Sequence, residues 1–181
     1  AAVGAPICRA SSPAQIDRAR ALVIPGVGHF RSTAALDSAW RRAIRARLAD
    51  GAALLGICLG MQWLFDGSDE ADTTPGLGLI RGRCYRLPGP VKVPHVGWNT
   101  LALSSPARLL NGIGGSASMY FTHTYAAPVV RETSATTDHG GTFCAATEAG
   151  RVTGTQFHPE KSGAAGLRVV ANFVAMAREG H

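Results

Sequence analysis

The feature that most constrains the fold is a short apolar run that leads directly into a cysteine between two glycines. Residues 52–57 read AALLGI and are followed by CLG, so that Cys58 has Gly56 two positions before it and Gly60 two positions after it. A continuous apolar run of this length predicts a strand covered on both faces. Residues 59–65 predict a helix. We therefore predict a sharp strand–turn–helix junction at Cys58, in which the glycines relieve crowding.

This junction has the geometry of a nucleophile elbow in which cysteine replaces serine. Cys58 would lie at the N-terminus of the helix, where backbone N–H groups and the helix dipole favour a thiolate over a thiol. The N–H group of Leu59 would point toward an oxyanion that develops in the reaction. A buried structural cysteine in a glycine-rich turn is the alternative interpretation. Cys8, Cys84 and Cys144 lack this setting, and we interpret them as small core residues in strands or a hairpin.

A second stretch supplies the groups that would activate the cysteine. Residues 155–162 read TQFHPEKS, in which Pro159 stiffens the chain between His158 and Glu160. A carboxylate on one ring nitrogen of His158 would leave the other nitrogen free to act as a base for Cys58. The alternative interpretation is a loop histidine beside a solvated glutamate, and only folding can bring the distant histidine and cysteine together.

Strands alternate with helices along the rest of the chain, which predicts an α/β layered domain. The length of 181 residues fits one domain, spanning residues 1–181. Strand patterns occur at 21–24, within 79–103, at 119–125 and as a hairpin over 143–157. Helix patterns begin at Ser12-Pro13 and cover 37–48 and 165–178.

The composition excludes several classes of protein. Hydrophobic residues make up 46% and charged residues 17%, which is typical of a globular chain. No apolar run is long enough to span a membrane and no secretory signal is visible. Cysteine and histidine spacing predicts neither a disulfide framework nor a metal site, so we expect a cytoplasmic protein. We interpret the basic cluster of Arg41, Arg42, Arg45 and Arg47 as a solvated helix face, not a nucleic-acid site.

The two chemistry-bearing stretches resemble the motifs of the class I, or triad, glutamine amidotransferases. GICLG at 56–60 resembles their nucleophile motif, and FHPE at 157–160 resembles their His–Glu motif. Other stretches resemble one group within that family, the glutaminase subunits of imidazole glycerol phosphate synthase. These stretches are PGVGHF at 25–30, MQ at 61–62, VPHVGWN at 93–99, YFTHTY at 120–125 and the segment from 156 to 173. The resemblance implies a three-layer, flavodoxin-like α/β fold and a glutaminase of histidine biosynthesis that needs no cofactor.

The resemblance also implies roles for the matching residues. Cys58 would form a glutamyl thioester, His158 would act as base and acid, and Glu160 would orient the imidazole. Two backbone N–H groups would form the oxyanion hole. One is that of Leu59, and the other is that of Val27 or Gly28. The glutamine pocket would be lined by Gln62, His123, Thr124 and Tyr125.

A further set of matching residues would face the cyclase subunit that receives the ammonia. This set is Trp98, Asn99, Tyr120 and Lys161. Alternative interpretations remain for several of these positions. Trp98 and Tyr120 would also suit a core, Lys161 a solvated surface, and His95 and His123 a structural role.

The start of the chain departs from the family pattern. Family members begin with a strand, a glycine-containing turn and a helix, whereas residues 1–7 resemble the end of that helix and the second strand. We therefore expect a fold that lacks its first strand and most of its first helix, with exposed strand edges. Three other functions stay open: another triad amidotransferase, such as the glutaminase of pyridoxal phosphate synthesis, an inactive truncated homologue that acts as a binding module, and a cysteine hydrolase acting on peptides.

Overall fold

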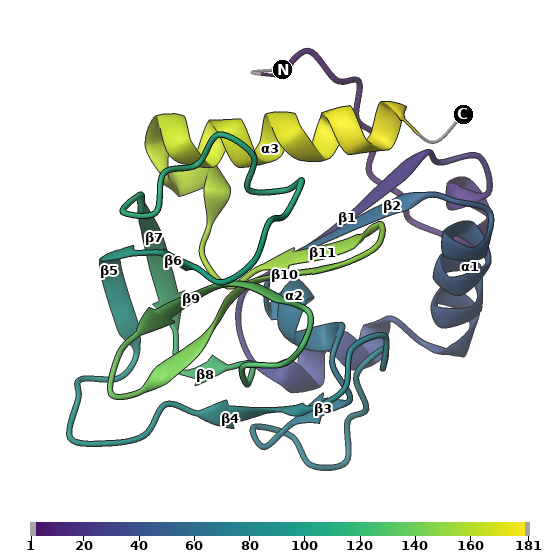
Figure 1. The fold of residues 1–181 in the computed structure, drawn as a ribbon. Coiled ribbons are helices and arrows are strands. Elements are labelled where there is room, and N and C mark those ends of the chain that lie inside the picture. Colours follow the sequence, from purple (N-terminus) through teal and green to yellow (C-terminus); the bar gives the residue numbers. More distant parts are fainter. Residues whose placement is uncertain (1–2, 180–181) are drawn as a thin grey trace.

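A six-stranded sheet forms the centre of the computed structural model, which describes residues 3–179 (Figure 1). The strand order is β1-β2-β11-β10-β9-β6. The strands are β1 (Ala21–Gly26), β2 (Ala53–Cys58), β11 (Val152–Thr155), β10 (Thr142–Ala149), β9 (Thr133–Asp138) and β6 (Ala102–Leu103). β2 is parallel to both of its neighbours, and the remaining pairs are antiparallel. The mixed sheet and its helices confirm the predicted α/β layered fold.

Helices cover the two faces of this sheet. They are α1 (Ser38–Ala49), α2 (Leu59–Trp63) and α3 (Gly163–Arg178), with 3₁₀ segments η1 (Pro13–Ile16), η2 (Phe30–Ala35) and η3 (Pro159–Lys161). Leu55 of β2 belongs to the core that contains Phe173 of α3, whereas the preceding Leu54 belongs to the core that contains Ile44 of α1. Because successive strand residues face opposite ways, β2 contributes to both cores. In Figure 1, α3 accordingly lies apart from α1 and α2.

Two smaller sheets flank the central sheet, one at the left and one below it in the view of Figure 1. One pairs β5 (His95–Thr100) with β7 (Ser118–His123), and the other contains β3 (Gly67–Ser68), β4 (Arg83–Arg86) and β8 (Tyr125–Ala126). Only Thr124 separates β7 from β8. The chain from 122 to 125 therefore passes from one small sheet to the other, and it forms a wall of the site described below.

Most of the predicted elements are present with small changes in length. Strand 21–24, strand 52–57, the hairpin over 143–157 and helices 37–48 and 165–178 are confirmed as β1, β2, β10–β11, α1 and α3. The helix predicted over 59–65 ends at Trp63. The helix stops there because the carbonyl groups of residues 63–65 accept hydrogen bonds from the N–H groups of residues 77–79, in a different segment of the chain.

The prediction of a strand near the start of the chain is wrong. Residues 5–10 have no regular structure, Ile7 is 88% exposed and Cys8 is also exposed, contrary to its expected place in a strand. Pro6 has no N–H group to donate to a neighbouring strand. β1 pairs with β2 alone and forms the edge of the sheet. Ala1 and Ala2, which belonged to the expected helix end, lie outside the described residues.

The basic cluster on α1 is not simply a solvated face, as the sequence analysis predicted. Arg41 and Arg45 donate to carbonyl groups of residues 75–77, and Arg47 donates to the carbonyl of Ala19 at 3.0 Å. These guanidinium groups bind loops that lie far from α1 in the sequence, so the arginines anchor the helix to its neighbours.

None of the helices described between residues 3 and 179 is long and apolar enough to cross a membrane.

Candidate active site

The predicted strand–turn–helix junction is present at the end of β2, and its backbone is strained at Cys58. This residue has φ of 53°, and no other non-glycine residue within 3–179 has a positive φ. Such backbone conformations cost roughly 1–3 kcal/mol and persist where the surrounding structure imposes them. A Cβ atom at Gly56 would lie 2.6 Å from the Gly60 carbonyl oxygen, and one at Gly60 would overlap the carbonyl of Ile24. The two glycines therefore permit the close packing that holds Cys58 in place.

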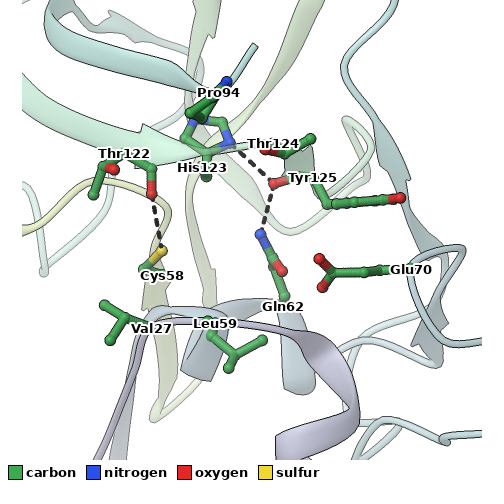
Figure 2. Close-up of a pocket in the computed structure, with 11 residues that line it drawn as sticks. Val27, Cys58, Leu59, Gln62, Glu70, Pro94, Thr122, His123, Thr124 and Tyr125 are labelled. Atoms are coloured by element: carbon green, nitrogen blue, oxygen red, sulfur yellow. Dashed lines mark hydrogen bonds between the residues drawn. The ribbon is translucent and has the colours of Figure 1, made fainter.

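Cys58 lies in the wall of a pocket of about 350 Å³ (Figure 2). This volume falls at the small end of the roughly 300–1,000 Å³ typical of small-molecule sites. The pocket brings together the nucleophile candidate and every residue that was predicted for the oxyanion hole and the glutamine site. These residues are Val27, Gly28, Cys58, Leu59, Gln62, His123, Thr124 and Tyr125.

The carbonyl oxygen of Tyr125 organises the polar groups of this pocket. Gln62 Nε2 donates to it at 2.6 Å, and His123 Nδ1 lies 2.9 Å from it (Figure 2). A carbonyl can only accept, so His123 carries its proton on Nδ1 and its Nε2 accepts from His95 Nδ1 at 3.1 Å. Burial lowers the pKa of His123 to about 3, and burial together with His139 lowers that of His95 to about 4. Both imidazoles are therefore neutral at physiological pH.

His158 and Glu160 form the predicted pair beside this pocket. His158 Nδ1 lies 2.8 Å from Glu160 Oε1, and the imidazole is buried whereas the carboxylate side chain is 53% exposed. Since β11 is parallel to β2, the ends of the two strands place His158 and Cys58 at the same edge of the sheet. His158 Nε2 makes no hydrogen bond to any residue within 3–179, and the Cys58 thiol instead contacts the Thr122 carbonyl at 3.8 Å. A hydrogen bond between thiol and imidazole is thus not formed here.

The environment of the Cys58 thiol does not favour the thiolate, contrary to the sequence-based expectation. Burial raises the pKa of this thiol to about 11, although the N–H of Leu59 and the amide of Gln156 lower it. The helix that follows has only five residues, so its dipole lowers the pKa of the thiol less than burial raises it. The proton of the thiol must therefore be removed as part of the reaction.

Three polar residues at the site were not predicted: Glu70, Gln156 and Thr122, whose carbonyl oxygen lies 3.8 Å from Cys58 Sγ. Glu70 lines the pocket, and its Oε2 accepts from the N–H of Phe30 at 2.7 Å. Glu70 lies in a polar loop whose sequence has no periodicity, so no pattern identified it. Gln156 is completely buried and donates to Cys58 Sγ at 3.5 Å. Its place immediately before the FHPE motif was the available signal.

The family can be assigned from the whole sequence. The sequence profile described as "Glutamine amidotransferase class-I" matches residues 6–177. The chain belongs to this family. The predicted glutamine amidotransferase activity is confirmed by this match.

Several relatives of this amidotransferase carry the name "Imidazole glycerol phosphate synthase subunit HisH". The relative from Geobacillus kaustophilus is 41% identical, over 97% of this chain and 87% of its own. The relative from Deinococcus radiodurans is 47% identical, over 88% and 77%. A crystal structure of a glutamine amidotransferase has a TM-score of 0.71 and 21% identity, over 93% of this chain and 85% of that one. The glutaminase domain of Trypanosoma brucei CTPS has a TM-score of 0.66 and 16% identity, over 93% and 75%. These two structures share the fold.

Three of the four predicted partner-facing residues of this amidotransferase form one surface. Trp98 is 59% exposed and lies opposite Tyr120 across β5 and β7, with ring centroids 6.1 Å apart. Lys161 Nζ lies 5.8 Å from the Tyr120 ring. The side chain of Asn99 lies elsewhere, because its Nδ2 donates to the Asp138 carbonyl at 2.8 Å. The exposure of Trp98 rules out the alternative of a core aromatic residue.

Proposed function

We propose that this chain is the cytoplasmic glutaminase subunit of an imidazole glycerol phosphate synthase. It hydrolyses glutamine to glutamate and ammonia and delivers the ammonia to a cyclase subunit in histidine biosynthesis. The observation that carries the chemistry is the strained Cys58 in the wall of a small pocket that holds all the predicted glutamine-binding residues. Relatives of that name, 40–47% identical over most of both chains, support the biological role.

The first half of the reaction forms a thioester. His158 Nε2 takes the proton of the Cys58 thiol, and the sulfur attacks the side-chain carbonyl carbon of glutamine. Because Glu160 holds Nδ1, Nε2 is the nitrogen left for this transfer. The contact between Nε2 and the thiol forms when glutamine is bound, since such hydrogen bonds are often long before binding. The imidazolium then protonates the departing nitrogen, the C–N bond breaks, and ammonia leaves.

The oxyanion of the tetrahedral intermediate needs donors that are already in place. We assign this role to the N–H of Leu59 and to one from Val27 or Gly28, which lie in the pocket wall with Cys58. Removing one such donor typically raises the barrier by roughly 3–4 kcal/mol. This stabilisation matters because a primary amide is a weak electrophile.

The second half of the reaction releases glutamate. His158 takes a proton from water, the hydroxide attacks the thioester carbon, and the C–S bond breaks. The departing thiolate of Cys58 is reprotonated by the imidazolium, which restores the starting state. Glu160 stabilises the positive charge on His158 in both halves.

The polar groups of the pocket select glutamine. Glu70 supplies a carboxylate for the α-ammonium group of the substrate, and its contact with the N–H of Phe30 fixes its position. Gln62 and the backbone at Thr124 and Tyr125 provide amide and carbonyl groups that fix the rest of the molecule. This set of contacts distinguishes a free amino acid from the peptide substrates of a general cysteine hydrolase.

The surface formed by Trp98, Tyr120 and Lys161 is the docking site for the cyclase subunit in this proposal. Val96 lies two residues from Trp98 on β5 and is 57% exposed, so that β5 presents two large apolar side chains to solvent. Aromatic residues of this kind commonly supply most of the binding energy of an interface. Asn99, predicted for the same surface, does not lie on it but holds β5 against β9 through its hydrogen bond to the Asp138 carbonyl.

The test measures glutamate release from glutamine with and without a cyclase subunit carrying its nucleotide ligand. We expect release that rises with the cyclase, is absent from Cys58→Ala, and needs a higher cyclase concentration in Trp98→Ala. Stimulation by a pyridoxal phosphate synthase subunit instead of the cyclase would assign the chain to that other group of amidotransferases. A folded chain that releases no glutamate under any condition would refute the proposed activity.

A further inference from the structure

A buried amide connects the glutamine pocket to the sulfur of Cys58. Gln156 is completely buried, its Nε2 lies 3.5 Å from Cys58 Sγ, and its Oε1 lies 3.0 Å from Gln62 Nε2. Sulfur is larger than oxygen, so this separation is longer than the roughly 2.9 Å of an N–H···O bond. Gln156 lies just beyond the end of β11, and β11 pairs with β2 alongside the segment that ends at the cysteine.

The orientation of this amide follows from its neighbours. The backbone carbonyl of Tyr125 can only accept, so the atom of Gln62 that faces it at 2.6 Å is the NH₂ group. That same NH₂ group faces Gln156, which must therefore present its carbonyl oxygen to it. The NH₂ group of Gln156 is then left to face Cys58. A fixed backbone atom thus sets the direction of the whole chain of hydrogen bonds, part of which is visible in Figure 2.

The thiolate has few sources of stabilisation in its surroundings. Burial is the largest influence on the pKa of Cys58 and raises it, and Glu160 on η3 raises it further. The N–H of Leu59, the amide of Gln156 and the charge of Lys161 act in the opposite direction. The Thr122 carbonyl accepts from the thiol and has no donor to offer the thiolate. Gln156 is therefore the one side-chain donor placed on the sulfur among the described residues.

We propose that Gln156 is a catalytic residue that donates a hydrogen bond to the sulfur of Cys58 and stabilises the thiolate that attacks glutamine and leaves in thioester hydrolysis. Gln62 positions Gln156 by holding its carbonyl oxygen. This role rests on the proposed glutaminase reaction but concerns a step that can be observed without turnover, namely the ionisation of Cys58. A residue that only supported Gln62 would affect glutamine binding and leave the thiol unchanged.

The test measures how fast iodoacetamide alkylates Cys58 between pH 7 and pH 9, with the modified peptide quantified by mass spectrometry. Gln156→Met keeps a similar shape but removes the donor. When a charged group loses a hydrogen bond, its pKa typically changes by at least about one pH unit. We therefore expect Cys58 to react about tenfold more slowly at each pH. In the glutaminase assay, kcat should fall about tenfold while KM for glutamine changes by less than about threefold.

Two further variants keep the result interpretable. Thr153→Val on β11 removes another buried hydrogen bond, from Oγ1 to the Leu54 carbonyl at 2.8 Å, and should leave alkylation of Cys58 unchanged. Gln156→Glu has the same shape, places an oxygen against the sulfur, and should also slow alkylation. Unchanged alkylation in both Gln156 variants, or a raised KM with unchanged kcat, would overturn the role of Gln156. Absence of glutaminase activity in the unaltered chain would instead count against the proposed function.

Discussion

Acid should destabilise this protein through two buried histidines whose tautomers are fixed by one chain of hydrogen bonds. Asn99 Nδ2 lies 3.3 Å from His95 Nε2, His95 Nδ1 lies 3.1 Å from His123 Nε2, and His123 Nδ1 lies 2.9 Å from the Tyr125 carbonyl. Each ring nitrogen in this series of hydrogen bonds already has a hydrogen-bond partner of the opposite kind, a donor or an acceptor. Protonating either imidazole would put two N–H groups against each other. A charge on His95 would also lie beside the stacked ring of His139, whose centroid is 4.1 Å from that of His95.

The sign and size of the effect follow from the two pKa values. Both pKa values are lower in the folded chain than the ordinary 6.5, at about 4 for His95 and about 3 for His123. The stabilisation is therefore fully present above pH 6.5 and is lost as the pH falls toward the folded values. At pH 5 the unfolded chain binds a proton at each histidine and the folded chain does not. Each histidine then lowers the free energy of unfolding by about 2 kcal/mol relative to pH 8, or about 4 kcal/mol together.

Urea denaturation at pH 8 and pH 5 measures this loss directly. His123→Gln removes one of the two titrating groups, so its loss between the two pH values should be about 2 kcal/mol smaller than that of the unaltered chain. His29→Gln, at an exposed histidine, is the matched control and should lose as much as the unaltered chain. An equal loss in His123→Gln and the unaltered chain would refute the argument. So would an NMR titration in which His123 is protonated at pH 5.

Three further predictions concern the elbow, the anchor of α1 and the catalytic pair. Gly60→Ala places a methyl group onto a backbone carbonyl of β1, and we expect urea denaturation to show a loss of about 1–3 kcal/mol; an unchanged midpoint would contradict the packing argument. Arg41→Met removes hydrogen bonds to three loop carbonyls and should lower the Tm, whereas Arg42→Met at an exposed position should not; equal melting temperatures would show that the anchor contributes nothing. Glu160→Gln should lower kcat for glutamine at least about tenfold with little change in KM, because His158 loses the carboxylate that stabilises its charge; unchanged kcat would remove Glu160 from the mechanism.

The elements that the sequence predicts well are those whose pattern is local. The apolar run of β2, the 3.6-residue period of α1 and the glycine pair around Cys58 each specify a conformation within a few residues. The elbow follows from this local information, since the close packing at this turn leaves no room for a Cβ atom at Gly56 or Gly60. Strand β9 was missed because its sequence, TSATTD, is mostly polar and resembles a loop.

The features that the sequence did not reveal depend on contacts between distant segments. Nothing local distinguishes a solvated arginine from Arg41, whose partners at residues 75 and 76 come from another loop. The high pKa of the Cys58 thiol likewise depends on burial in the folded protein, whereas the helix terminus that favours a thiolate is adjacent in the sequence. Local reasoning therefore overestimated the thiolate and missed Glu70 and Gln156, which folding brings to the pocket and the sulfur.

Trp98 and Asn99 show how strand geometry divides a single motif between two tasks. Both belong to the same short stretch of β5, and both were predicted for one surface. Successive residues of a strand point to opposite faces, so Trp98 reaches solvent beside Tyr120 while Asn99 turns toward His95 and Asp138. The ribbon of β5 and β7 thus carries an exposed aromatic surface on one face and the hydrogen bonds that fix the pocket on the other. Position along the strand, not membership of the motif, decides which of the two tasks a residue serves.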